Sequence, residues 1–380
     1  MGATVPPTDA PTAVGADLGR PPPPRVSGPL AWARRHLFAG PGSTVATVIA
    51  LALLAVALPP LARWGLLDAV WRADYQACRD LDHHAACWGM VAEKHRLILF
   101  GRYPYQAQWR PLVATLLVVL MLLVSGHPRA WRPWLLGGWA AALGGFVLLM
   151  RGGLLGMAPV GTESWGGLPL TVLLTLVAVG ASIPIGIALA LARRSGLPLV
   201  RAGATLLIEL TRGVPLITVL FVATFVFPLV LPRAIQTDAL GRILLALTLF
   251  QSAYMAEVVR GGLQALPRGQ QEAAASLGLG WWQTQRKVVL PQALVLVIPS
   301  FVNSLLSTFM DTSLVTVVSM YDLTGALRLA LGDPQWRNFF LEGYLFVGAV
   351  YLLSCLAMSR YAAWLEGHLG RWARRETTRA

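Results

Sequence analysis

The sequence predicts an all-α membrane protein that crosses the bilayer about eight times. Of its 380 residues, 56% are hydrophobic and only 13% are charged, whereas a soluble domain carries about 25% charged residues. The apolar residues gather in runs bounded by charged residues, proline or glycine. A bilayer core of roughly 30 Å needs about 20 apolar residues in a helix, which most of these runs approach. Composition and run length together indicate a polytopic membrane protein.

Eight apolar runs are the candidate transmembrane helices. The second and third are short for a bilayer. The seventh is interrupted by Asn303, Ser304 and Asp311, so we expect it to face protein or water rather than lipid. In chain order the runs lie at about 45–63, 111–126, 134–150, 168–192, 214–232, 242–259, 293–312 and 340–359.

The arginines predict how the chain is oriented. Basic residues concentrate before the first run, after every even-numbered run and in the tail, which is typical of cytoplasmic segments. With eight spans, both termini are therefore expected on the cytoplasmic side. The residues are Arg34, Arg35, Arg129, Arg132, Arg193, Arg194, Arg201, Arg260, Arg268, Arg286, Lys287, Arg371, Arg374, Arg375 and Arg379.

The chain divides into four predicted regions. Residues 1–44 are rich in proline and are expected to be disordered and cytoplasmic, and they lack the apolar core of a cleavable signal. Residues 45–160 form a three-span region with an external loop at 64–110. A glycine- and proline-rich stretch near residue 160 separates it from a five-span core at 161–361. The tail at 362–380 is basic and cytoplasmic.

Several function classes fit this sequence poorly. The net charge of +13 does not indicate nucleic-acid binding, because the arginines lie at the ends of apolar runs. Neither Lys94 nor Lys287 follows a glycine-rich loop, so the sequence contains no P-loop. All six histidines lie outside the candidate spans, which leaves an intramembrane enzyme as an unfavoured alternative. A secondary transporter would usually show an internal repeat, and none is clear.

The external loop carries Cys78, His83, His84 and Cys87. Their spacing could hold a metal, but it lacks the usual CxxC pair. A disulfide between Cys78 and Cys87 is favoured, because we expect the loop to face an oxidising compartment. Free thiols and a metal site remain alternatives.

A polar island between two apolar runs is the most informative segment. It begins with Glu272-Ala273-Ala274-Ala275-Ser276-Leu277-Gly278 and ends with Val289-Leu290-Pro291-Gln292-Ala293. The alanines present a flat face, Gly278 permits a sharp turn, and Pro291 marks a helix boundary. This pattern is typical of a segment that docks into a groove on a partner. The plain alternative is an ordinary amphipathic loop helix.

The island resembles the EAA loop of ABC-importer permeases in the order and spacing of Glu272-Ala273-Ala274, Gly278 and Leu290-Pro291. Other stretches are similar to the polar amino acid subgroup of that family. The likeness extends from about 165 to 361, and the extra N-terminal spans look like the larger permeases of general L-amino acid transporters. The further motifs are Arg212-Gly213-Val214-Pro215, Tyr254-Met255-Ala256-Glu257-Val258-Val259-Arg260-Gly261-Gly262, Pro267-Arg268-Gly269-Gln270, Gln292-Ala293 and Asp311-Thr312-Ser313-Leu314.

The resemblance implies a transport subunit with an ABC type I importer-like core, and not an enzyme. A separate ATPase subunit dimer would bind ATP and Mg, and the coupling loop at 260–291 would dock on it, so this chain would hold no cofactor or metal of its own. A second permease subunit and a periplasmic amino acid-binding protein are the other implied partners. The implied location is the bacterial inner membrane, in contact with lipid. A permease for another small polar solute is the main alternative.

The same resemblance and the cost of burying charge in a membrane indicate residues for a substrate pathway. The candidates are Glu257, Asn303, Asp311, Thr312 and Ser313. The family usually has lysine before the aspartate, and here Met310 replaces it. Asp311 therefore lacks an adjacent cation, and Arg212 or Arg260 could supply one.

Overall fold

The computed structural model describes residues 28–377, apart from 82–83, 155, 231, 233–236 and 268, and the side chains of 29–31 and 369–377 are also outside it. Expectations about residues 1–27, His83, Arg268 and Arg379 therefore concern residues outside the described part. So do those about the side chains of Arg371, Arg374 and Arg375.

The chain separates into two compact units, Met1–Asp68 and Ala69–Ala380. The first unit contains α1 (Pro29–His36), α2 (Pro41–Ala62) and the π-helix η1 (Arg63–Leu67). The helices α1 and α2 extend into the stretch 1–44, where the sequence predicts disorder. Proline occupies the first turn of both, where its fixed φ suits a helix start and its missing N–H costs no hydrogen bond.

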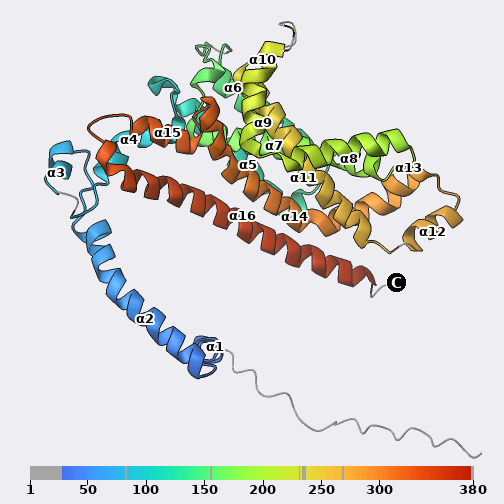
Figure 1. The fold of residues 1–380 in the computed structure, drawn as a ribbon, viewed down its shortest axis with the longest axis horizontal. Helices are drawn as coiled ribbons and strands as arrows, with labels where there is room; N and C mark the ends of the chain where they lie inside the picture. The colour runs from blue at the N-terminus through green and yellow to red at the C-terminus, as the bar shows by residue number, and fades with distance from the viewer. Residues whose placement is uncertain are drawn as a thin grey trace, which may run out of the picture. The chain divides into compact units, whose positions relative to one another are not determined.

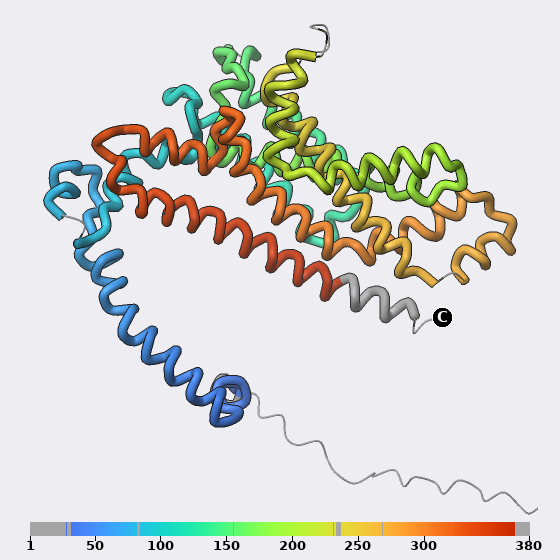
Figure 2. Tube along the Cα trace, in the orientation of Figure 1, coloured from blue at the N-terminus to red at the C-terminus, as the bar shows by residue number. Residues whose placement is uncertain are grey.

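The second unit is also helical, and its described residues form no β-strand beyond two isolated bridges. Figure 1 shows its helices, and Figure 2 shows the path of the chain through them. In chain order they are α3 (Tyr75–Arg79), α4 (Gly89–Phe100), η2 (Tyr105–Ala107), α5 (Trp109–Ser125), η3 (Pro128–Ala130), α6 (Trp134–Arg151), η4 (Thr162–Ser164), α7 (Gly167–Arg193), α8 (Pro198–Gly213), α9 (Leu216–Phe221), η5 (Val222–Val226), α10 (Phe227–Val230), α11 (Ala239–Ala265), α12 (Gly269–Ser276), α13 (Trp281–Thr284), η7 (Gln285–Val289), α14 (Leu290–Asp311), η8 (Thr312–Val318), α15 (Leu323–Ala330), η9 (Arg337–Phe339) and α16 (Phe340–Thr377).

Seven helical segments in the described residues are long and apolar enough to cross a membrane, and an eighth exists if one bent pair counts as a single span. Each of the eight predicted runs falls within one of these segments or overlaps it. The first and last residues of the predicted runs differ from those of the helices, because the helices continue beyond the apolar residues. The seven segments are Pro41–Leu67, Tyr105–Ser125, Trp134–Arg151, Gly167–Arg193, Ala239–Ala265, Trp281–Val318 and Arg337–His368.

The bent pair corrects the sequence prediction between residues 193 and 216. That stretch was expected to be a loop, but residues 198–213 form the helix α8. A break at Val214 and Pro215 then turns the chain by 104° into Leu216–Val230. Proline disfavours a helical conformation in the residue before it, which explains the break at Val214. The amphipathic pattern of α8 is not a continuous apolar run, so a search for such runs missed it.

The core of unit 2 lies where α7 and α11 cross. Gly186 of α7 permits the contact, since a Cβ there would lie 2.7 Å from the Met255 Cβ of α11. One buried cluster joins these helices to α5, α6 and α9, and includes Phe146, Leu174 and Ile243. Another, toward the coupling loop, joins α7, α8 and α11 to the start of α14. These contacts fix the relative positions of the helices that carry the candidate pathway and coupling residues.

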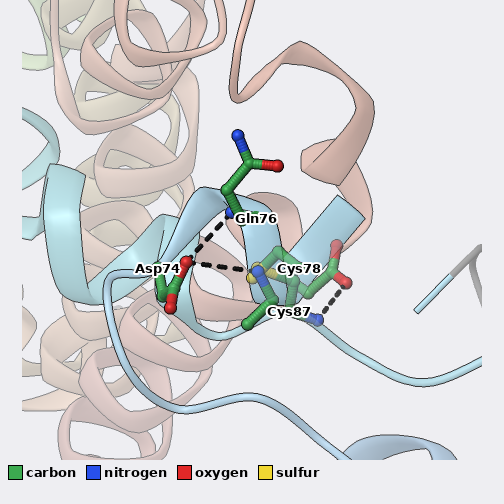
Figure 3. The surroundings of a disulfide bond; sticks show 6 residues. Asp74, Gln76, Cys78 and Cys87 are labelled. Carbon is green, nitrogen blue, oxygen red and sulfur yellow. Dashed lines mark hydrogen bonds between the residues drawn. A yellow bond between two sulfur atoms is a disulfide. The ribbon is translucent and has the colours of Figure 1, made fainter. Parts of the chain in front are cut away.

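The predicted external loop at 64–110 is largely helical. Cys78 of α3 and Cys87 form a disulfide, whose surroundings are drawn in Figure 3. The buried Glu342 carboxylate accepts a hydrogen bond of 2.8 Å from the Cys87 N–H. Both cysteines belong to a buried cluster with α4, α15 and the start of α16. With both sulfurs bonded to each other, neither is a free thiol or a metal ligand. The boundary predicted near residue 160 stays a prediction.

Candidate functional site

The coupling loop, residues 260–291, is built around the short helix α12. Glu272 and Ala273 are exposed on this helix, whereas Ala274 is buried at 3% exposure. The Gln292 amide of α14 donates a hydrogen bond of 3.3 Å to the Gln270 side chain and ties α12 to the long helix. The helix α12 lies next to α13 at one end of unit 2 (Figure 1), with Glu272 and Ala273 exposed on it.

Gly278 ends α12 in a Schellman motif. Its φ is +74°, a value that glycine adopts without strain. The Leu279 N–H donates to the Ala274 carbonyl at 3.1 Å and the Gly278 N–H donates to the Ala275 carbonyl at 2.9 Å. These two hydrogen bonds satisfy carbonyls that the end of a helix leaves unpaired. The sharp turn expected from the sequence at Gly278 has this local cause.

Leu290 and Pro291 lie at the base of the loop and not at its tip. Leu290 is half-buried against the cluster that joins α7, α8 and α11, and Pro291 is exposed in the first turn of α14. The chain stays helical through this point, because the π-helix η7 leads directly into α14. A widened turn accommodates a proline, which cannot donate the usual hydrogen bond. Pro291 thus marks a change of helix type rather than an interruption.

Five charged side chains form an arginine–glutamate cluster near the coupling loop. Arg193 of α7 contacts Glu257 of α11 at 2.7 Å and Glu209 of α8 at 2.8 Å. Arg260 contacts Glu257 at 2.6 Å, because residues three apart share a helix face and their spacing in the sequence predicts this pair, and Arg212 lies 3.8 Å from Glu257. Glu257 therefore meets guanidinium groups from three helices, and its side chain is only 16% exposed.

A polar cavity of about 610 Å³ lies between α11 and α14. Its α14 wall carries polar side chains at helical spacing, which places them on one face. Gln251 and Tyr254 of α11 face them, and the Arg212 guanidinium lies 5.5 Å from the centre of the Tyr254 ring. The polar α14 residues are Ser300, Asn303, Ser304, Ser307 and Asp311. The cavity lining therefore contains the Asp311 carboxylate, several hydroxyls and two amides. The Arg212 guanidinium lies close to Tyr254, which is one of the lining residues.

The structure brings only some of the pathway candidates together. Asn303 and Asp311 line the polar cavity. Glu257 lies in the arginine–glutamate cluster instead, and the buried Thr312 hydroxyl, at the start of η8, donates to the Phe309 carbonyl of α14. Ser313 follows Thr312 in η8 and is not among the cavity-lining residues.

Asp311 receives no cation from the residues suggested for it. Arg212 and Arg260 both pair with Glu257, and within the described residues Asp311 has no ion pair. Gln251 and Tyr254 also line the cavity, and neither was predicted from the sequence as a pathway residue. Gln251 is a polar residue within an apolar run, and Tyr254 lies three positions further on the same helix face. The spacing of these two polar residues within an apolar run is the feature that could have identified them from the sequence.

The fold and these two sites define a multi-pass membrane protein with a polar cavity between its spans and a rigid helical protrusion at one end. The chain belongs to the family described as "Binding-protein-dependent transport system inner membrane component", whose pattern matches residues 182–371. It is therefore a transport subunit that serves an ATPase partner and a substrate-binding protein, and it is not an enzyme.

Two relatives extend the likeness over most of the chain. The Escherichia coli protein named inner membrane amino-acid ABC transporter permease protein YhdY is 42% identical, and the match covers 89% of this chain and 92% of the relative. The Rhodobacter capsulatus glutamate/glutamine/aspartate/asparagine transport system permease protein BztC is 34% identical, and the match covers 93% of this chain and 96% of the relative. A solved structure of an amino acid ABC transporter with histidines is 29% identical over 53% of this chain and 92% of that chain, with a TM-score of 0.48.

Proposed function

We propose that this chain is a permease subunit of an ATP-driven importer of polar or general L-amino acids in a bacterial inner membrane. The observation that carries the proposal is the exposed helix α12, which is closed by Gly278 and held between two long spans. An ATPase subunit would bind ATP and Mg and grip this helix. Its closure would move α12 and, through η7, the spans that border the polar cavity.

The chemistry of the polar cavity supports an amino acid as the substrate. An amino acid carries an ammonium group and a carboxylate. Asp311 offers the ammonium a carboxylate, and Asn303 with the serines offers hydrogen bonds to polar side chains. Arg212 lies beside the ring of Tyr254, which lines the cavity, and would be a cation for the substrate carboxylate. The names of the two relatives point to the same substrate class.

The assembly that we propose contains a second permease subunit, an ATPase dimer and a periplasmic amino acid-binding protein. The coupling loop and the arginine-rich ends would face the cytoplasm, in agreement with the bias of basic residues. The disulfide between Cys78 and Cys87 would then lie on the oxidising side.

Copurification and transport test this proposal together. The chain would be expressed with the other subunits, purified and placed in proteoliposomes with the binding protein. We expect an ATPase to copurify and ATP to drive uptake of labelled amino acids from a panel. Copurification without uptake of any amino acid would favour another small polar solute. Absence of an ATPase from the complex would contradict the proposal.

A further inference from the structure

A second polar cavity lies at the coupling-loop end of unit 2. Its volume is about 600 Å³, within the range of small-molecule sites. It is enclosed by the C-terminal end of α7, the last turns of α11 and the first turn of α12. Its polar lining consists of Arg193, Arg194, Arg260, Gln264, Gln271 and Glu272.

Positive charge exceeds negative charge around this cavity. Glu209 and Glu257 offset part of the charge of the three arginines in the arginine–glutamate cluster. Arg194 adds a further guanidinium. Its side chain is exposed, and it has no hydrogen bond or ion pair to any residue in the described part of the chain. Glu272 is the carboxylate on the opposite wall.

The cavity is also preorganised. The Arg260 guanidinium donates to Glu257 at 2.9 and 2.6 Å and to the Gln264 side chain at 3.1 Å, which fixes its position. Arg193 is held by Glu209 and Glu257. A ligand would therefore need to order few side chains besides Arg194, which reduces the entropic cost of binding.

We propose that this cavity is a regulatory site for a small organic anion bearing a carboxylate or a phosphate group. The anionic group binds Arg194, because a guanidinium matches either group with two hydrogen bonds. Glu272 and Gln271 of α12 take an ammonium or hydroxyl group at the other end of the ligand. The bound molecule joins the end of α7 to α12.

The regulatory effect rests on the proposed function. A ligand that links α12 to α7 opposes the movement of α12 relative to the spans, so transport slows. An imported amino acid accumulates on the side of the membrane that this cavity faces under the proposed orientation. The site then provides feedback inhibition by the product. An acidic lipid headgroup has the same anionic chemistry and is the second source of ligand.

The test uses the complete transporter in proteoliposomes that enclose ATP on the coupling-loop side. The lumen contains sodium chloride alone, sodium L-glutamate or inorganic phosphate, in vesicles with or without phosphatidylglycerol. We expect luminal glutamate or phosphate to lower the initial uptake rate. Arg194→Gln removes a charge-assisted hydrogen bond, which should raise the half-inhibitory concentration about tenfold.

Arg201→Gln is the matched control, since Arg201 is an exposed arginine on α8 outside this cavity. It should leave the half-inhibitory concentration unchanged. If a lipid headgroup is the ligand, uptake follows the phosphatidylglycerol content, and Arg194→Gln removes that dependence. The proposal is overturned if no anion alters uptake, or if the two variants shift the response equally.

The chloride arm separates this inference from the transport proposal. If uptake occurs in chloride and no anion changes its rate, the regulatory site alone is contradicted. If no uptake occurs in chloride, the transport proposal is contradicted. In that second case, titration calorimetry of phosphate and glutamate into the purified full chain still tests the site. Heat of binding that Arg194→Gln removes supports it, and no binding to the wild-type chain refutes it.

Discussion

At the residue scale, Gly278 and Glu257 each determine part of the structure in or near the coupling loop, by different means. Gly278 acts through the backbone, because its positive φ closes α12. Glu257 acts through charge, because it holds guanidinium groups of α7, α8 and α11 together. The sequence identified both residues. It could indicate the turn at Gly278 and, from their spacing, the pairing of Glu257 with Arg260, but not the contacts of Glu257 with Arg193 and Arg212.

Replacing Gly278 by valine should disturb the end of α12. A branched side chain in the left-handed conformation costs roughly 1–2 kcal/mol, although open space surrounds the position. We expect reduced ATPase copurification and reduced uptake with normal membrane insertion. Gly280→Val is the matched control, because Gly280 also has open space but an ordinary φ of −66°. Equal losses in both variants would contradict the role of backbone conformation.

Glu257→Gln should destabilise the arginine–glutamate cluster, since three guanidinium groups would lose their shared carboxylate. Because Glu257 is only partly buried and its arginine partners are more exposed, we expect a cost between that of an exposed pair, up to about 1 kcal/mol, and that of a fully buried pair, about 3–5 kcal/mol. Glu209→Gln should cost no more than about 1 kcal/mol, because the Glu209 side chain is 55% exposed. Thermal unfolding of the detergent-solubilised chain measures both. A Glu257 variant as stable as the Glu209 variant would show that the cluster adds little.

At the element scale, the segment of α3 and α4 is held against α15 and α16 by apolar, hydrogen-bonding and ionic contacts. The disulfide joins α3 to the residues just before α4, and Trp336 packs edge-on against Tyr75. Lys94 of α4 pairs with Asp333, just beyond α15, at 2.8 Å. The segment therefore forms a small layer packed on α7, α15 and α16.

Changing Cys78 and Cys87 together to serine should loosen this layer. The cysteines are 9 positions apart, and closing a loop of about ten residues stabilises by roughly 2–3 kcal/mol in the chain-entropy account. We expect faster amide hydrogen exchange in α3 and the first turn of α4, with little change in α7 and α11. Cys355→Ser, at the free cysteine, serves as the control. Unchanged exchange in α3 would contradict the prediction.

The contact between Lys94 and Asp333 should make the stability of the layer depend on pH. The hydrogen bond from Lys94 holds the pKa of Asp333 below its usual range, which is near 3.9 in an unfolded chain. A lowered pKa in the folded state stabilises the fold above about pH 4 and loses that effect as the pH falls through the folded value.

Lys94→Met tests this contact. The difference in melting temperature between the wild-type chain and this variant should be present at neutral pH and shrink as the pH falls through the lowered pKa of Asp333 and its carboxylate becomes protonated. Arg328→Met, on the neighbouring helix α15, is a control for loss of a charge as such. A difference that does not change with pH would mean that the side chain acts through packing alone.

At the scale of the whole molecule, unit 2 contains every buried cluster in the described residues. The three clusters use residues between Val70 and Tyr351, whereas α2 of unit 1 has no buried residue. Unit 2 should therefore keep its fold without a covalent link to unit 1.

A protease site inserted between Asp68 and Ala69 tests this independence. After insertion into the membrane and cleavage, the melting temperature of unit 2 should move by less than about 2 °C, which corresponds to roughly 1 kcal/mol for a domain of this size. A protease-resistant insert of equal length at the same junction is the control. A large decrease on cleavage would show that unit 1 stabilises unit 2.

The sequence by itself determined the helical class, the positions of the apolar spans and the resemblance carried by the polar island. These features depend on properties of neighbouring residues: run length, helical spacing and turn chemistry. It missed α8, because an amphipathic helix does not appear as a continuous apolar run.

Only the tertiary structure decided which polar residues meet. It placed Asn303 and Asp311 of α14 opposite Gln251 and Tyr254 of α11, and it brought Glu257 of α11 to Arg193 of α7 and Arg212 of α8. It also placed Arg194 of α7 and Glu272 of α12 in the lining of a second cavity. Each of these groupings joins residues of helices that are separate along the chain. Their distances depend on how the helices cross, as at Gly186 and Met255, and spacing along one helix carries no information about the angle at which another helix packs against it.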